Sequence, residues 1–181
     1  AILRSNDQGR TWQKFDLPIG VGGNADGRGT GERLVVDPAN GQVIYYGSNR
    51  DGLWKSSDGG VSFARISAPA SSISLLFFDP RDHVLYLGGV DGQGHLFASK
   101  DDGKTFTPVS STPDMIPQRM AQGSDGTLFV TYARGDKEGE VNPAAATTGG
   151  VWRRDLQGKW AEITPEKPAN GAKFGYSGVD V

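Results

Sequence analysis

An eight-residue pattern, S-x-D-x-G-x-[TS]-[WF], recurs along the 181-residue chain and limits its possible folds more than any other feature. The three copies begin at Ser5, Ser56 and Ser99, 51 and 43 residues apart, and a divergent copy, with one residue fewer between its glycine and its aromatic residue, covers residues 153–160. Repeats at this interval are typical of proteins that stack or radially arrange similar structural units. The sequence therefore predicts an array of units rather than one irregular core.

Short runs rich in β-branched and aromatic residues precede each copy, for example residues 43–47, 75–78, 84–87 and 128–132. Turn clusters with glycine, proline, asparagine and aspartate separate these runs, and glycine alone supplies 27 of the 181 residues. No segment keeps an apolar period of 3.6 residues over three turns. Each unit is expected to hold four short antiparallel strands, which is the blade of an all-β propeller.

The repeated pattern is expected to form the hairpin between the third and fourth strands of a blade. Its serine and aspartate can bond to backbone N–H groups of their own loop, and its glycine can take a positive φ. Its aromatic residue is expected to pack into the seam between blades and bury roughly 150–250 Å2. These structural positions are Ser5, Asp7, Gly9 and Trp12, then Ser56, Asp58, Gly60 and Phe63, then Ser99, Asp101, Gly103 and Phe106.

The strand count predicts about three and three-quarter blades. Residues 1–17 would end one blade, residues 18–67, 68–110 and 111–165 would form three more, and residues 172–181 would begin another. Propellers close with four to eight blades, so the chain is expected to be part of a larger ring. Residues 133–149 are expected to form an inserted loop between the second and third strands of their blade.

Charge and composition exclude several classes of function. Nineteen basic and 21 acidic residues give a formal net charge of −2, so no basic surface for nucleic acid is expected. No apolar run approaches the roughly 20 residues of a membrane span. Cysteine is absent, and His83 and His95 have no metal-ligand spacing. We therefore expect no metal site and no cofactor.

The segment from Ile19 to Gly31 is the strongest candidate for ligand contact. It joins the fourth strand of one blade to the first strand of the next, and such connections line the binding face of propellers. Asn24, Asp26 and Arg28 lie there on a glycine-rich backbone that a ligand can approach closely. The alternative is a polar loop in which Glu32 and Arg33 pair with each other.

Aromatic side chains could provide a platform for a sugar ring, whose C–H groups form an apolar face. Tyr45, Tyr46 and Trp54 have suitable side chains. Because adjacent strand residues point to opposite faces, at least one tyrosine should enter the core, and Tyr46 is taken as the substrate contact. Trp54 and Trp152, which occupy equivalent places in their units, are expected to pack between blades.

The repeated pattern is the Asp-box of sialidases, sortilin-type receptors and several glycosidases. A longer stretch is more specific: GGNADGRGTGERLVVDP at residues 22–38, followed by YYG at 45–47 and GLWKS at 52–56. This stretch resembles the xyloglucan-cleaving endoglucanases of glycoside hydrolase family 74, which carry GGN-x-x-GR-x-x-GERL-x-VDP in their first propeller. The resemblance extends over nearly the whole chain and is strongest at residues 17–63.

The resemblance implies two seven-bladed propellers that face each other across an open cleft. Family members cleave β-1,4 links with inversion, using one aspartate from each propeller. The segments that carry those aspartates have no match here, and Asp7, Asp58 and Asp101 belong to Asp-boxes. No catalytic residue is therefore assigned, and it stays open whether this segment takes part in catalysis.

The leading interpretation is a part of a secreted or periplasmic xyloglucanase in which this segment supplies scaffold and one wall of the cleft. Its partners would be xyloglucan or another β-glucan, the remainder of the same propeller, and a second propeller. The alternative is a non-catalytic Asp-box propeller that binds glycans or protein partners. A sialidase-like enzyme is less favoured because no arginine triad is evident.

Overall fold

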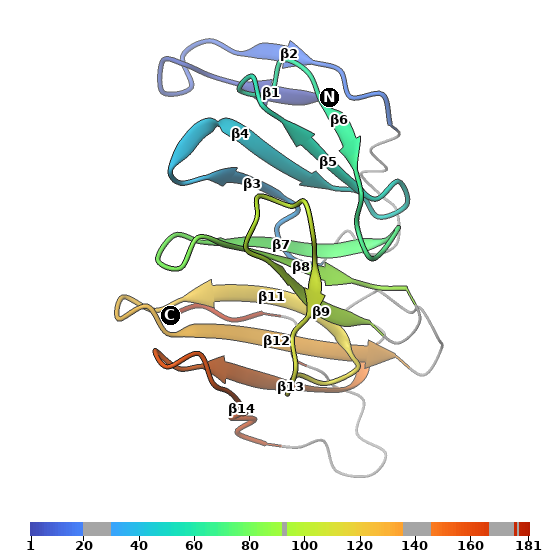
Figure 1. Cartoon of the computed structure of the whole chain (residues 1–181), viewed down its shortest axis with the longest axis vertical. Helices are drawn as coiled ribbons and strands as arrows, with labels where there is room; N and C mark the ends of the chain where they lie inside the picture. The colour runs from blue at the N-terminus through green and yellow to red at the C-terminus, as the bar shows by residue number, and fades with distance from the viewer. Residues whose placement is uncertain (20–29, 92–93, 136–145, 167–175, 177) are drawn as a thin grey trace.

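The computed structural model describes residues 1–19, 30–91, 94–135, 146–166, 176 and 178–181. Within these residues there are four antiparallel sheets and no helix, so none of their segments is a helix that could cross a membrane. Figure 1 shows the sheets following one another in chain order along the long axis of the molecule. The prediction of an all-β propeller built from four-stranded antiparallel units is confirmed.

The first sheet has two strands and each of the other three has four. The first consists of β1 (Ile2–Arg4) and β2 (Gln13–Phe15). The second consists of β3 (Leu34–Asp37), β4 (Asn40–Gly47), β5 (Leu53–Ser56) and β6 (Ala64–Ile66). The third consists of β7 (Ile73–Asp79), β8 (Val84–Gly89), β9 (His95–Ser99) and β10 (Thr107–Pro108). The fourth consists of β11 (Ile116–Gln122), β12 (Leu128–Gly135), β13 (Ala146–Arg154) and β14 (Trp160–Glu162).

Each four-stranded sheet is a meander in which consecutive strands pair. The first strands β3, β7 and β11 contact one another in that order, and backbone bonds join neighbouring sheets there. Ile73 N–H donates to the carbonyl of Ser48 at 2.9 Å, and Leu76 N–H donates to the carbonyl of Glu32 at 2.6 Å. The strands of each sheet end on two opposite sides of the molecule. We call the side that carries the Asp-box hairpins the box edge, and the side that carries the sheet-to-sheet connections the connection edge.

The core lies between the sheets and consists of two clusters, one on each face of the third sheet. Because successive strand residues point to opposite faces, Leu85 and Leu87 of β8 enter the cluster shared with the second sheet. Val84 and Tyr86 enter the cluster shared with the fourth sheet. All six residues of β8 are buried, so its sequence reads as a continuous apolar run rather than an alternating one.

Close contact between the second and third sheets requires a glycine at position 47. A Cβ atom there would lie 2.6 Å from Cγ2 of Ile73, closer than real Cβ contacts allow. The glycine that ends β4 therefore lets the first strand of the next sheet pack directly against it.

The Asp-box hairpins have the same hydrogen bonds in all three full copies. In the second copy, Ser56 Oγ accepts a bond from Gly60 N–H at 2.8 Å and donates one to Asp58 Oδ1 at 2.7 Å. Asp58 also accepts bonds from the N–H and hydroxyl of Ser62, at 2.9 and 2.6 Å. Gly60 has φ of 89°. Equivalent bonds link Ser5, Asp7, Gly9 and Thr11, and Ser99, Asp101, Gly103 and Thr105.

These bonds stabilise the ionised form of the box aspartates. Hydroxyl and backbone donors, first among them the hydroxyl of Thr11, Ser62 or Thr105, lower the pKa of Asp7, Asp58 and Asp101 to about 2. The divergent fourth copy has Arg153 in place of the serine. Its Asp155 still accepts bonds from the N–H groups of Gln157 and Lys159.

Two of the box aromatic residues pack between sheets. Phe106 and Trp160 contact the core clusters between their own sheet and the preceding one. Trp12 belongs to the first described sheet, is 59% exposed, and donates its Nε1–H to the carbonyl of Gly9 at 3.1 Å. Inter-blade packing of Trp12 stays a prediction.

The expected inserted loop at residues 133–149 is shorter in the structure. Strand β12 continues to Gly135 and β13 begins at Ala146, so both strands extend into that range because their backbones continue to pair. Residues 136–145 lie outside the described part of the chain. Residues 18–67, 68–110 and 111–165 each contain the four strands of one sheet. In the range 172–181, the described residues 176 and 178–181 form no strand.

We expect Leu87→Ala to lower the free energy of unfolding by about 2–5 kcal/mol, because the side chain is fully buried between two sheets and truncation leaves a cavity. Urea unfolding followed by tryptophan fluorescence measures this difference. The control is Leu3→Ala, since Leu3 is 59% exposed and should change stability by less than about 0.5 kcal/mol. Equal effects of the two substitutions would contradict the core assignment.

Asp58→Asn should destabilise the protein at pH 7 and lose this effect in acid. The folded-state pKa of Asp58 lies below its unfolded value, so its contribution is present above about pH 4 and disappears as the pH falls towards 2. The melting temperatures of wild type and variant should therefore converge over that interval in scanning calorimetry. The control is Asp180→Asn, which replaces an exposed carboxylate outside the boxes. Its melting temperature should not differ from that of wild type by an amount that disappears in acid.

Candidate functional site

The three loop residues predicted to contact substrate, Asn24, Asp26 and Arg28, lie outside the described residues. The described chain resumes at Thr30, which is buried, and passes close to the fourth sheet. A Cβ atom on Gly31 would lie 2.5 Å from the carbonyl oxygen of Gln118 in β11. The C-terminal end of the predicted binding loop is therefore held where the first strands of three sheets meet.

An ion pair also links this part of the chain to the fourth sheet. Glu32 Oε1 lies 3.3 Å from Nη1 of Arg119 on β11, with both side chains exposed. The alternative in which Glu32 pairs with Arg33 does not match the structure, which gives Glu32 a partner 87 residues away. Such an exposed pair contributes little to stability, so its main effect is to position this edge of the site.

Tyr46, the fourth predicted substrate contact, lies near the end of β4 at the connection edge. It is half-buried and stands opposite Leu34 on β3 and Trp54 on β5. Tyr45 points to the other face and is completely buried in the core, as the alternation predicted. Tyr46, Trp54 and Leu34, which is 42% exposed, thus share the face of the second sheet that is directed away from the third sheet, just after the C-terminal end of the predicted loop.

Polar groups flank this aromatic row. Burial raises the pKa of Tyr46, the nearby guanidinium of Arg33 opposes that rise, and the carboxylate of Asp51 adds to it. The phenol is therefore neutral at physiological pH and can both donate and accept a hydrogen bond. Trp54 Nε1–H donates to the carbonyl of Asp51 at 3.1 Å, which fixes the indole ring. Trp152 packs in the core with its ring edge-on to Tyr132, as expected for an inter-blade residue.

The remaining loops of the connection edge are ordered by carboxylate contacts. The carboxylate of Asp91 accepts bonds from the N–H groups of Ser71 and Ser72, at 2.7 and 3.2 Å. His95 Nδ1 lies 3.2 Å from Oδ1 of Asp114. These contacts make a polar rim that suits a hydroxyl-rich ligand.

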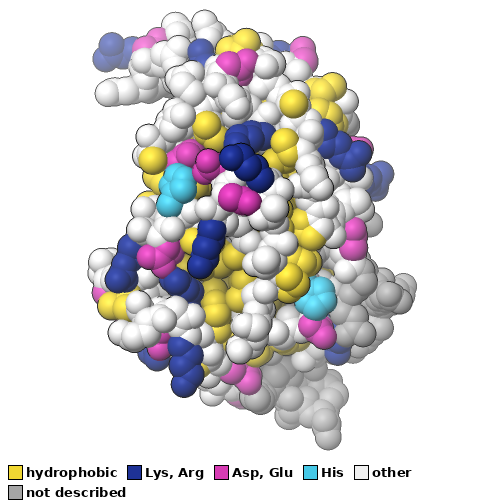
Figure 2. Space-filling view, viewed as in Figure 1, with side chains coloured by type: hydrophobic (Ala, Val, Ile, Leu, Met, Phe, Trp, Pro, Cys, Tyr) yellow, Lys and Arg dark blue, Asp and Glu magenta, His cyan; other side chains and the backbone are white. Residues whose placement is uncertain are grey.

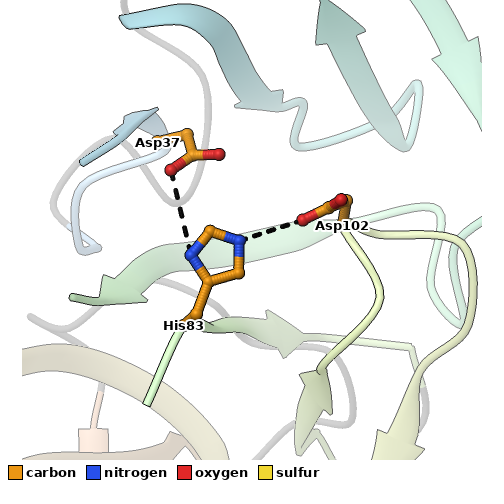
Figure 3. Close-up of side chains that lie close together, drawn as sticks. All are labelled: Asp37, His83 and Asp102. Atoms are coloured by element: carbon orange, nitrogen blue, oxygen red, sulfur yellow. Dashed lines mark hydrogen bonds and ion pairs between the residues drawn. The ribbon is translucent and has the colours of Figure 1, made fainter. Parts of the chain in front are cut away.

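A cluster that the sequence analysis missed lies at the box edge and consists of Asp37, His83 and Asp102. Figure 3 shows the imidazole ring between the two carboxylates. Its Nε2 lies 3.1 Å from Oδ1 of Asp102, and its Nδ1 lies 4.0 Å from Oδ1 of Asp37. One donor atom from each residue lies within 4.8 Å of the others, which is a possible arrangement for a metal ion. The sequence signal was weak, because one strand end and two separate turns supply the three residues.

A groove of about 480 Å3 runs between the third and fourth sheets at their outer strands. Its lining includes Tyr86 and Trp160, whose rings meet edge-on at 6.1 Å, together with Lys100 and Arg154. Figure 2 shows an apolar hollow flanked by basic side chains on this face of the molecule. Arg154 is held by Asp82 at 2.7 Å, so the groove carries only a small excess of positive charge.

No protein-family model matches the chain. Sequence comparison finds a xyloglucanase from a Paenibacillus species that is 35% identical over 210 aligned residues and covers 100% of this chain and 20% of the relative. The chain thus spans about a fifth of the length of that curated relative.

Two solved structures support the same relationship. An enzyme of glycoside hydrolase family 74 from Niastella koreensis matches with a TM-score of 0.81 and 30% identity, over 96% of this chain and 27% of that one. A family 74 xyloglucanase from Xanthomonas campestris matches with a TM-score of 0.80 and 32% identity, over 95% and 27% of the two chains. Together with the repeated Asp-box hairpins and the four-stranded meanders, these matches show that the chain belongs to glycoside hydrolase family 74 and forms part of a propeller of that family.

Proposed function

We propose that the chain is part of a glycoside hydrolase that cleaves the β-1,4-glucan backbone of xyloglucan. The observation that carries the proposal is the match in both sequence and fold to family 74 enzymes over nearly the whole chain. In this proposal the segment provides scaffold and one wall of the substrate cleft, and a second propeller provides the other wall. The enzyme acts outside the cytoplasm, where its polymeric substrate is found.

The connection edge of the second sheet is the proposed sugar-binding surface of this segment. Tyr46 and Trp54 offer aromatic faces to the C–H groups of a pyranose ring, and the Tyr46 hydroxyl can bond to a sugar hydroxyl. Asn24, Asp26 and Arg28 are proposed to add hydrogen bonds from the neighbouring loop. A polar rim around an aromatic platform is the usual composition of a site for hydroxyl-rich ligands.

The catalytic carboxyl groups are proposed to come from other parts of the enzyme. An inverting glycosidase needs an acid and a base about 6.5–9.5 Å apart on opposite sides of the scissile bond. Asp7, Asp58 and Asp101 cannot fill either role, because each is bonded within its own hairpin at the box edge. This segment therefore acts by binding and orienting the glucan, which brings the reacting bond to groups held elsewhere.

The proposal can be tested by expressing the complete reading frame that contains this chain and assaying it on xyloglucan, mixed-linkage β-glucan and cellulose. We expect hydrolysis of xyloglucan, with the α-anomer as the first product in a time-resolved proton NMR experiment, as inversion requires. Binding of xyloglucan without hydrolysis would instead support a glycan-binding propeller. Release of the β-anomer would overturn the inverting mechanism.

Arg28→Ala should raise KM for xyloglucan oligosaccharides by about tenfold and leave kcat nearly unchanged, because it removes a bond made equally in the ground state and the transition state. Steady-state kinetics of the complete enzyme measure both constants. The matched control is Arg10→Ala, which removes an exposed arginine from an Asp-box hairpin and should change neither constant. Equal KM values for wild type and Arg28→Ala would remove this residue from the site.

A further inference from the structure

The cluster at the box edge of the second and third sheets lies at the opposite edge from the proposed sugar-binding surface. Asp37 is the last residue of β3, His83 lies in the β7–β8 turn, and Asp102 lies in the Asp-box hairpin between β9 and β10. Figure 3 shows the three side chains converging from these separate segments. We propose that Asp37, His83 and Asp102 bind a divalent transition-metal ion, with Zn2+ as the best match, and that this ion links two adjacent blades.

The distances fit a shared ion. Two ligands bound to zinc at about 2.1 Å in tetrahedral geometry lie about 3.4 Å apart. His83 Nε2 and Asp102 Oδ1 are 3.1 Å apart, and the donors of all three residues lie within 4.8 Å of one another. The widest separation must therefore close by up to about 1.4 Å. Such a movement is small for His83 and Asp102, whose side chains are 44% and 48% exposed and lie in turns.

The donor chemistry also favours a transition metal. One imidazole nitrogen and two carboxylate oxygens suit Zn2+ or Mn2+, whereas Ca2+ prefers a shell made only of oxygen ligands. Open coordination positions would hold water, since two of the three residues are exposed. Asp37 Oδ1 accepts a bond from Ala39 N–H at 2.8 Å, which fixes the orientation of that carboxylate.

The local charge leaves room for a cation. Lys55 Nζ donates to the backbone carbonyl of Asp102 at 2.9 Å and so brings one positive charge close to two carboxylates. Two carboxylates and one ammonium group leave a net negative charge at the cluster when the imidazole is neutral. The carboxylates also act on Tyr45, whose pKa is raised by burial first and then by the charges of Asp102 and Asp37.

At the equivalent position one blade further along, the neighbours of the carboxylate are an amide and a guanidinium group. Asp79 occupies the place of Asp37, is fully buried, and accepts a bond from Gln122 Nε2 at 2.9 Å. Its Oδ2 lies 3.7 Å from the guanidinium of Arg154. At Asp37 the corresponding neighbour is His83 at 4.0 Å, and it is the only ion-pair partner of Asp37 among the described residues. A metal ion beside Asp37 would occupy the position that Arg154 occupies beside Asp79.

The test is metal titration of the complete, untagged protein after treatment with a chelator and dialysis. Isothermal titration with ZnCl2 at pH 7 should show that wild type binds one more Zn2+ per chain than His83→Gln or Asp102→Asn. Alternatively, each variant should bind that ion at least about tenfold more weakly than wild type. Co2+ should give a visible absorption spectrum in wild type that His83→Gln lacks. Zn2+ should also raise the melting temperature of wild type more than that of either variant.

The matched control is His95→Gln. Among the described residues His95 has one carboxylate neighbour, Asp114, so the His95→Gln variant should bind metal as wild type does. Circular dichroism and the metal-free melting temperature show whether each variant is folded, and Asp102→Asn suits the positive φ of that residue because asparagine tolerates it. Identical Zn2+ stoichiometry and affinity in wild type and folded His83→Gln would overturn the proposal. Neither result depends on glucan hydrolysis, so the metal site and the proposed function can fail separately.

Discussion

The structure depends on the burial of the third sheet between two neighbours. Strand β8 is buried along its whole length, with Leu85 and Leu87 facing one neighbour and Tyr86 facing the other. No single sheet of this kind can cover both of its own faces, so each unit needs the next one for stability. This is the physical reason that the chain is built from repeats. Its stability therefore depends more on contacts between sheets than on contacts within any single blade.

Polar contacts then fix the sheets at their edges. At the box edge, Asp37 and Asp79 end equivalent strands, and each carboxylate faces a side chain from the following sheet. At the connection edge, Glu32 follows the predicted binding loop and pairs with Arg119. The apolar interior therefore sets the stacking of the sheets, and the two edges can carry different chemistry. We propose sugar binding at one edge and a metal ion at the other.

The Asp-box shows how a motif can be frequent and still have a structural role. Its aspartates have strongly lowered pKa values, a feature often associated with active sites. Here the cause is a set of local hydroxyl and backbone donors within one hairpin, so the shift stabilises a turn. The same pattern tolerates variation, since the fourth copy keeps its turn without the serine.

The sequence alone determined the strand content, the meander within each blade and the hairpin at each box, because these depend on residues close together in the chain. It also predicted that one of the adjacent tyrosines would be buried, since alternation along a strand is a local rule. The tertiary structure decided the rest: that Glu32 pairs with Arg119, and that Asp37, His83 and Asp102 meet. Each of these outcomes depends on which sheet lies beside which, and that relation joins residues tens of positions apart that no local pattern connects.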